Sequence, residues 1–169
     1  MRKPILITLA LLLLFVIAFS ASALAGDGNH AFEARLKGYE ETPAINSAGT
    51  GQFSASVNSS GTTITYTLRY SGLSGPAAAA HIHFGQRGVA GGVVAFLCGG
   101  DNKPACPASG TVTGTIVSSD IVAVPDQGIA AGDLAAVLKA MRAGRTYVNV
   151  HTANFPNGEI RGQIRDDDD

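Results

Sequence analysis

The stretch TTITYTLRY, residues 62–70, alternates between apolar and polar side chains from Thr63 onward. Side chains two residues apart on a strand point to the same side, so this alternation predicts a strand with one face in a core. The apolar face would carry Ile64, Tyr66, Leu68 and Tyr70, and the polar face Thr63, Thr65, Thr67 and Arg69.

Seven further segments have the same character and are separated by Gly, Pro and Asn residues typical of turns. They are FEARLKGY (32–39), GQFSASV (51–57), AAHIHF (79–84), GVVAFLC (92–98), GTVTGTIV (110–117), TYVNVHT (146–152) and EIRGQIR (159–165). About eight short strands in one chain predict a mostly β protein, a β-sandwich or barrel.

One segment, GDLAAVLKAMRAG (132–144), has helical periodicity instead. Its apolar residues fall at positions i, i+3, i+4 and i+7, Asp133 is a suitable N-cap, and Gly144 stands where a helix ends. We expect one short helix that packs against the sheet through Leu134, Val137, Leu138 and Met141. Binding of a cofactor by this apolar stripe is the less favoured interpretation.

The N-terminal segment 1–25 has the features of a secretory signal peptide. Arg2 and Lys3 precede an apolar run from Ile5 to Phe19, and Ala23-Leu24-Ala25 is a cleavage signal of the A-x-A type. A retained membrane anchor is the alternative, but the run is short for a span of about 20 residues. We therefore expect an exported protein, periplasmic or secreted, without a membrane span after cleavage.

Removal of residues 1–25 leaves 144 of the 169 residues, the size of one domain, which we place at residues 26–165. Cleavage takes away two of the twelve Lys and Arg residues and none of the thirteen acids, for a net charge of −3. Four of the acids form the terminal run 166–169, interpreted as a solvated C-terminal tail. The absence of a basic patch in the sequence argues against a nucleic-acid partner.

Cys98 and Cys106 are the two cysteines of the chain, in CGGDNKPAC. In an oxidising compartment a local disulfide is the default for such a pair. A thiol metal site or a redox pair is the alternative, but the C-x-x-C spacing and a histidine nearby in sequence are both lacking. We predict a structural bridge.

Three of the four histidines lie on predicted strands. His81 and His83 in AHIHFG (80–85) would project together, with Ala80 and Ile82 toward the core and the two imidazoles on an outer face. His151 would share a face with Tyr147 and Asn149. If the two strands are close, three imidazoles converge, a ligand set that suits copper, zinc or nickel and leaves a fourth position open. His30, beside the mature N-terminus, is expected to be uninvolved.

Structural histidines are the alternative to a metal site, since a histidine pair on a strand more often binds nothing. Ring nitrogens within about 4 Å of a common point would favour a metal, because the bonds to the ion are about 2 Å long. Other catalytic arrangements are poorly represented in the sequence. A G-x-S-x-G motif is lacking, and the adjacent Glu40 and Glu41 would point apart on a strand. Enzymatic activity is therefore not the favoured expectation.

Three ordered motifs resemble those of the CHRD domain, the module named after chordin. They are YEETPAINSAGTGQFSASV (39–57), AHIHFGQRGVAGGVV (80–94) and YVNVHTANFPNGEIRGQI (147–164). The resemblance covers residues 31–165 and implies an immunoglobulin-like Greek-key barrel, remotely similar to Cu/Zn superoxide dismutase. It implies little about activity. In chordin the domain belongs to an extracellular antagonist of growth factors.

The similarity to the dismutase implies copper ligands at His81, His83 and His151, which match that family in order and strand context. The bridging histidine and the zinc loop of the family have no counterpart here, so the similarity implies at most one metal, copper before zinc. Arg161 is either a cation near this site or an arginine paired on the surface. We expect a metal-binding exported domain, with superoxide chemistry a less favoured extension. The alternative is a protein-interaction or envelope module that binds an extracellular or envelope protein and no metal.

Overall fold

The computed structural model describes residues 31–167. The predicted signal peptide (1–25), His30 and Asp168–Asp169 therefore lie outside the described residues. Within residues 31–167, none of the helices has both the length and the apolar character that crossing a membrane requires.

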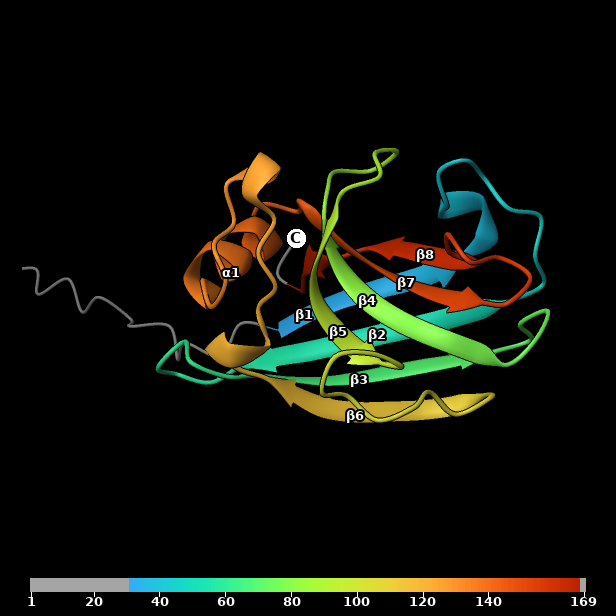
Figure 1. The fold of residues 1–169 in the computed structure, drawn as a ribbon, viewed down its shortest axis with the longest axis horizontal. Helices are drawn as coiled ribbons and strands as arrows, with labels where there is room; N and C mark the ends of the chain where they lie inside the picture. The colour runs from blue at the N-terminus through green and yellow to red at the C-terminus, as the bar shows by residue number, and fades with distance from the viewer. Residues whose placement is uncertain (1–30, 168–169) are drawn as a thin grey trace, which may run out of the picture.

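Strands dominate the described chain (Figure 1). They are β1 (Ala31–Lys37), β2 (Thr50–Val57), β3 (Ile64–Ser71), β4 (Ala77–Phe84), β5 (Gly92–Cys98), β6 (Gly110–Ile116), β7 (Thr146–Thr152), β8 (Ile160–Gln163) and β9 (Arg165–Asp166). The helices are α1 (Leu134–Arg142) and three 3₁₀ turns, η1 (Gly38–Glu40), η2 (Ser118–Asp120) and η3 (Pro125–Gln127).

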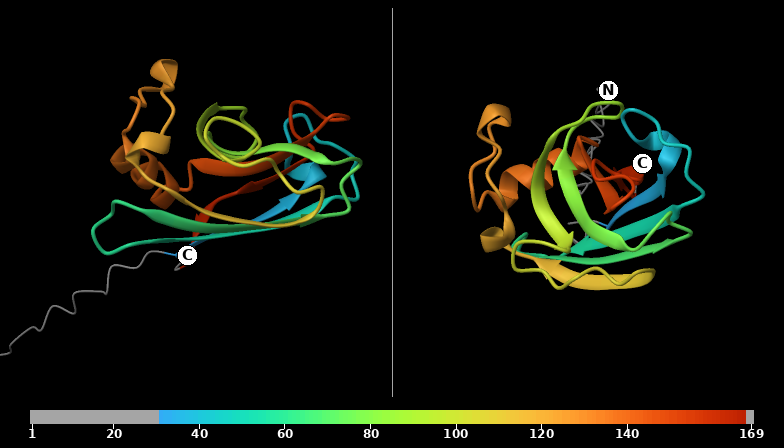
Figure 2. Two further views of the ribbon diagram at one scale, coloured as in Figure 1. Left: turned by 60° about the horizontal axis from the view of Figure 1, so that its bottom comes forward. Right: turned by 45° about the vertical axis from the view of Figure 1, so that its right-hand side comes forward.

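The strands form one antiparallel sheet in the order β5-β4-β7-β8-β1-β2-β3-β6, with the short β9 beside β1. Figure 2 shows this sheet curling into a nearly closed ring, so that β4, β5 and β7 lie over β1, β2 and β3. Where the two ends of the sheet approach, the Tyr66 hydroxyl on β3 donates to the Leu97 carbonyl on β5, 2.7 Å away. The expected mostly β barrel or sandwich of about eight strands with one short helix is confirmed.

The core fills the inside of this ring, as the alternation in residues 62–70 predicts. Ile64, Tyr66, Leu68 and Tyr70 are all buried, while Thr65 and Arg69 are exposed. On β4, Ala80 and Ile82 are likewise buried in the core, together with Val148 and Val150 of β7. The core therefore fixes which face of β4 and of β7 remains for the histidines.

The helix α1 begins and ends close to the predicted residues. The Asp133 side chain accepts a hydrogen bond from the Ala136 backbone N–H at 2.9 Å, and Gly144 adopts a φ of 63° just beyond the helix. The stripe of Leu134, Val137, Leu138 and Met141 is buried in the core. The packing interpretation of this stripe is therefore confirmed.

The C-terminal end of the chain differs from the expectation. The predicted last strand is divided into β8 and β9, because Ile164 turns into the core between them and its N–H donates to the Thr146 carbonyl. The ordered chain also continues into the acidic run. Asp166 pairs with Phe32 in β9, and the Asp167 N–H donates to the Ala31 carbonyl at 3.0 Å. Strand β9 thus includes the first residue of the acidic run, and Asp167 is exposed.

The predicted disulfide between Cys98 and Cys106 is confirmed, with a Cα–Cα distance of 5.0 Å. The loop that it closes lies against Phe96, so closely that a Cβ at Gly100 would be 2.7 Å from an atom of the Phe96 ring. The Phe96 ring also contacts the His81 imidazole, whose centroid is 4.6 Å away in an edge-to-face arrangement. The disulfide loop therefore supports one wall of the histidine cluster.

A buried carboxylate, Glu159, ties the β7–β8 turn to two other loops. Its oxygens accept hydrogen bonds from the Ser47 hydroxyl (2.6 Å), the Ser74 backbone N–H and hydroxyl (both 2.8 Å) and the Thr152 hydroxyl (2.7 Å). Burial alone would raise the pKa of Glu159, but these hydrogen bonds outweigh burial and hold the pKa below its ordinary value. The ionised carboxylate therefore stabilises the fold.

Replacement Glu159→Gln is expected to lower the free energy of unfolding by about 2 kcal/mol at neutral pH, because charged acceptors are lost from a buried network. A carboxyl group with a depressed pKa contributes stability above its unfolded pKa and loses it as pH falls through the folded value. The cost of E159Q should therefore shrink on acidification. Urea unfolding at neutral and acidic pH measures this, with the exposed Glu33→Gln as a near-neutral control; equal costs at both pH values would contradict the prediction.

Candidate metal centre

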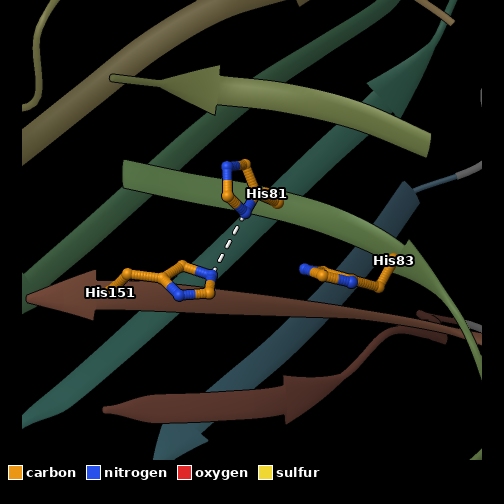
Figure 3. Close-up of side chains that lie close together, drawn as sticks. All are labelled: His81, His83 and His151. Carbon is orange, nitrogen blue, oxygen red and sulfur yellow. Dashed lines mark hydrogen bonds between the residues drawn. The ribbon is translucent and has the colours of Figure 1, made fainter. Parts of the chain in front are cut away.

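The pairing of β4 with β7 brings the three strand histidines together. In this register Ala79 is opposite His151 and His81 is opposite Asn149, so His151 lies diagonally across from His81. Figure 3 shows His81 and His83 projecting from β4 and His151 from β7 toward one space between the strands. The ring centroid of His81 is 4.8 Å from that of His151 and 5.6 Å from that of His83.

The ring nitrogens of these histidines are close enough to share one ion. His81 Nδ1 and His151 Nε2 are 3.1 Å apart, and one nitrogen from each histidine lies within 4.8 Å of the other two. Three nitrogens spaced in this way have a common point within about 3 Å of each. If an ion lay at that point, movements of the rings by about 1 Å would give nitrogen–metal bonds of about 2 Å. The sequence-based expectation that His151 reaches His81 and His83 is therefore correct in its geometry.

Backbone carbonyls fix the orientation of two of the rings. His83 Nδ1 is 2.9 Å from the Gly91 carbonyl oxygen, and His151 Nδ1 is 2.9 Å from the Pro156 carbonyl oxygen. A carbonyl oxygen only accepts, so in both rings Nδ1 must carry the hydrogen and Nε2 holds the lone pair. Both lone pairs are thereby available as ligands, in the way that outer hydrogen bonds orient metal-binding histidines.

The imidazoles lie on the predicted outer face of the β4–β7 pair, but other segments cover them. His83 is only 8% exposed, and its ring stacks on Tyr147 with a centroid distance of 4.7 Å and an angle of 8°. His81 and His151 are half-buried. The histidines do lie on the face opposite the core, but Phe96 and the segment that contains Gly91 cover that face.

This cover keeps the imidazoles neutral. Burial, together with the neighbouring His151 and His83, lowers the pKa of His81 to about 3. Burial is also the main cause that lowers the pKa of His83 to about 4, and it lowers the pKa of His151. Near neutral pH all three rings are therefore uncharged, and an uncharged ring keeps one nitrogen lone pair for a metal ion.

Arg161 belongs to the same covered face and is not a surface arginine. It is 2% exposed, its guanidinium carbon lies 3.4 Å above the centre of the Tyr147 ring, and Nη2 donates to the Gln86 carbonyl at 3.0 Å. Because Tyr147 in turn stacks on His83, Arg161 is near the histidines, as one of the two interpretations of the sequence proposed.

Glu41 is a buried residue to which the sequence analysis assigned no role. It is 8% exposed, and burial raises its pKa to about 7 against the opposing charge of Arg161. Its neighbour Glu40 has a different environment, since it pairs with the exposed Arg87. Two adjacent acids give no signal of which one is buried, because that depends on the fold of the loop.

Asn149 was placed on the correct face by strand alternation, but without a role. It is 2% exposed, and its Oδ1 lies 3.0 Å from His151 Nε2. The same face of β7 therefore presents Tyr147, Asn149 and His151 to the two histidines of β4. Together these side chains form a buried group of hydrogen-bond acceptors that could hold a cation.

Comparison with curated proteins and with solved structures finds no match for this chain. The family model of the CHRD domain matches residues 32–164, which include every strand from β2 to β8 and all of the residues of the candidate metal centre. The chain therefore belongs to the CHRD domain family.

Proposed function

We propose that this protein binds a single transition-metal ion through His81, His83 and His151. The observation that carries the proposal is the orientation of two rings. The Gly91 and Pro156 carbonyls accept the Nδ1 hydrogens, which directs the Nε2 lone pairs of His83 and His151 toward each other. In the metal-free protein His151 Nε2 can accept a hydrogen from His81 Nδ1, 3.1 Å away, but the buried Nε2 of His83 has no hydrogen-bond partner within residues 31–167. A cation between the rings would satisfy both lone pairs.

Imidazole nitrogens indicate the class of metal. They suit copper, zinc and nickel better than calcium or magnesium, which prefer oxygen. Two donors about 2.0 Å from a tetrahedral ion are about 3.3 Å apart, similar to the 3.1 Å between His81 Nδ1 and His151 Nε2. Copper(II) is favoured because it stands at the top of the affinity order for divalent ions, and zinc is the alternative.

The location supports this assignment. Membership of the CHRD family and the Cys98–Cys106 disulfide suggest an extracellular or envelope location. We propose that residues 1–25 direct export. Residues 31–167 contain three histidines, all in the cluster described, which supports one ion and not a bridged pair.

Titration of the purified, chelator-treated protein with Cu²⁺ or Zn²⁺ tests the proposal. We expect one ion per chain by calorimetry and coordinated nitrogens in the Cu²⁺ EPR spectrum. His83→Ala and His151→Ala should each weaken binding by about 100-fold or more, since each removes a ligand. His30→Ala is the matched control and should bind like the wild type.

Circular dichroism of each variant shows whether the domain is folded, and His83→Gln replaces His83→Ala if the latter is not. Equal metal affinity of the wild type, His83→Ala and His151→Ala would end the proposal. Loss of thermal stability in those variants, without any metal affinity in the wild type, would instead favour structural histidines in a protein-interaction module.

A further inference from the structure

Asn149 lies at the centre of the covered face and has an environment unusual for an asparagine. It stands opposite His81 in the β4–β7 pairing and between Tyr147 and His151 on its own strand. Its side chain is 2% exposed, although an amide prefers water or a full set of hydrogen bonds.

The carbonyl end of the Asn149 amide faces a lone pair. Oδ1 is 3.0 Å from His151 Nε2, and that nitrogen holds a lone pair because Nδ1 of the same ring donates to Pro156. The same Nε2 can accept a hydrogen from His81 Nδ1, 3.1 Å away. That hydrogen bond leaves the two acceptors Nε2 and Oδ1 close together, and a cation near both would remove their repulsion. The Asn149 side chain also lies near His83.

The other end of the amide explains why the carbonyl is directed toward the histidines. A Cβ at Gly158 would lie 2.9 Å from Asn149 Nδ2 and 2.4 Å from Glu41 Oε1, so both atoms line the same spot. Glu41 Oε1 is buried and has no hydrogen-bond partner within residues 31–167. Rotation of the amide by half a turn would place its oxygen on the side of this carboxylate, which is electrostatically unfavourable. The observed orientation therefore presents Oδ1 to the histidines.

We propose that Asn149 Oδ1 is the fourth ligand of the metal ion, which completes a site of three imidazole nitrogens and one amide oxygen. This inference rests on the proposed function and goes beyond the three histidines. The spacing of the donors agrees with it, since His151 Nε2 is 3.0 Å from Asn149 Oδ1 and 3.1 Å from His81 Nδ1. Both spacings are near the separation of about 3.3 Å between neighbouring ligands of a tetrahedral ion.

A fourth protein ligand changes what the site can do. Catalytic zinc and copper sites keep one position open for water or substrate, while sites that only hold the ion are closed by protein ligands. With Asn149 bound, the position that three histidines alone would leave open is filled. The site then serves to hold a divalent ion and not to activate a ligand.

Two substitutions at Asn149 test this inference. Asn149→Leu keeps the volume but removes the oxygen, and should weaken Zn²⁺ binding about tenfold in competition with a chromophoric chelator. Asn149→Asp replaces the amide oxygen with a carboxylate and should strengthen Zn²⁺ binding by about tenfold. With Co²⁺ as a coloured probe, both variants should shift the visible absorption bands, because a ligand of the ion has changed.

Asn157→Asp, on the exposed part of the same β7–β8 turn, adds the same charge without a ligand and should leave the Co²⁺ spectrum unchanged. If Asn149 only supports the fold, its variants lower thermal stability and retain the wild-type spectrum, and that outcome overturns the inference while metal binding stands. If Asn149→Leu does not fold, the spectrum of Asn149→Asp decides. Failure of the wild type to bind Co²⁺ and Zn²⁺ overturns this inference, and failure to bind Cu²⁺ as well overturns the proposed function.

Discussion

Acidification of the metal-free protein from about pH 7.5 to about pH 4.5 is expected to remove about 5 kcal/mol of stability through His81 and His83 alone. Their folded pKa values, about 3 and about 4, lie below the ordinary value of 6.5 because both rings are buried beside other histidines. As pH falls below 6.5, His81 and His83 bind protons in the unfolded chain but stay uncharged in the folded chain. Stability is therefore full above 6.5 and is lost as pH falls toward the folded values.

Glu41 acts in the opposite direction over much of the same range. Its folded pKa is raised to about 7 by burial, so its contribution is fully present below its ordinary pKa of 4.5 and is lost as pH rises through 7. Its maximum effect is about 3 kcal/mol, from 1.36 kcal/mol per pKa unit. The wild-type pH profile is consequently a difference between these opposing contributions.

Urea unfolding in the presence of a chelator, repeated over the pH range, separates the two contributions. On acidification, the free energy of unfolding of His81→Gln should fall by about 2–3 kcal/mol less than that of the wild type, because one histidine with a lowered pKa has been removed. The free energy of unfolding of Glu41→Gln should fall by more than that of the wild type, since the carboxyl group that opposes the histidines has been removed. Parallel pH profiles for the wild type and both variants would show that these groups do not titrate as their burial requires.

Replacement Gly158→Ala is expected to lower the free energy of unfolding by about 2–4 kcal/mol and to weaken metal binding as well. Gly158 has a φ of 124°, which strains any residue with a side chain. In addition, the new Cβ would overlap Glu41 Oε1 and Asn149 Nδ2, at 2.4 and 2.9 Å. Relief requires these two buried side chains to shift, and a shift of Asn149 changes its 3.0 Å approach to His151 Nε2.

Gly110→Ala is the matched control for the backbone part of this effect. Gly110 has a similar φ of 116°, but a Cβ there would meet nothing within 4 Å. We expect Gly110→Ala to lower the free energy of unfolding by about 1–2 kcal/mol and to leave metal binding unchanged, because only conformational strain is added. Equal costs for the two alanine variants in thermal or urea unfolding would contradict the close approach of Glu41 and Asn149 to Gly158.

The sequence determined the fold class and most of the elements. Alternation in residues 62–70 correctly predicts which side of β3 is buried, and the 3.6-residue spacing in residues 132–144 correctly predicts α1 and its packing. Both patterns depend on local geometry, which repeats every two residues in a strand and every 3.6 in a helix. The C-terminal end was less predictable, because the pairing of Asp166 with Phe32 joins residues far apart in the chain.

The candidate site divides in the same way. The two-residue alternation of a strand predicts that His81 shares a face with His83 and that His151 shares a face with Asn149. The two pairs lie on different strands. Only the β4–β7 register brings the two pairs together, and only the loops that contain Gly91 and Pro156 orient the rings. The burial of Arg161 and Glu41 was likewise decided by tertiary structure. Whether a polar side chain is covered depends on which distant segment packs over it, and no local pattern in the sequence encodes that.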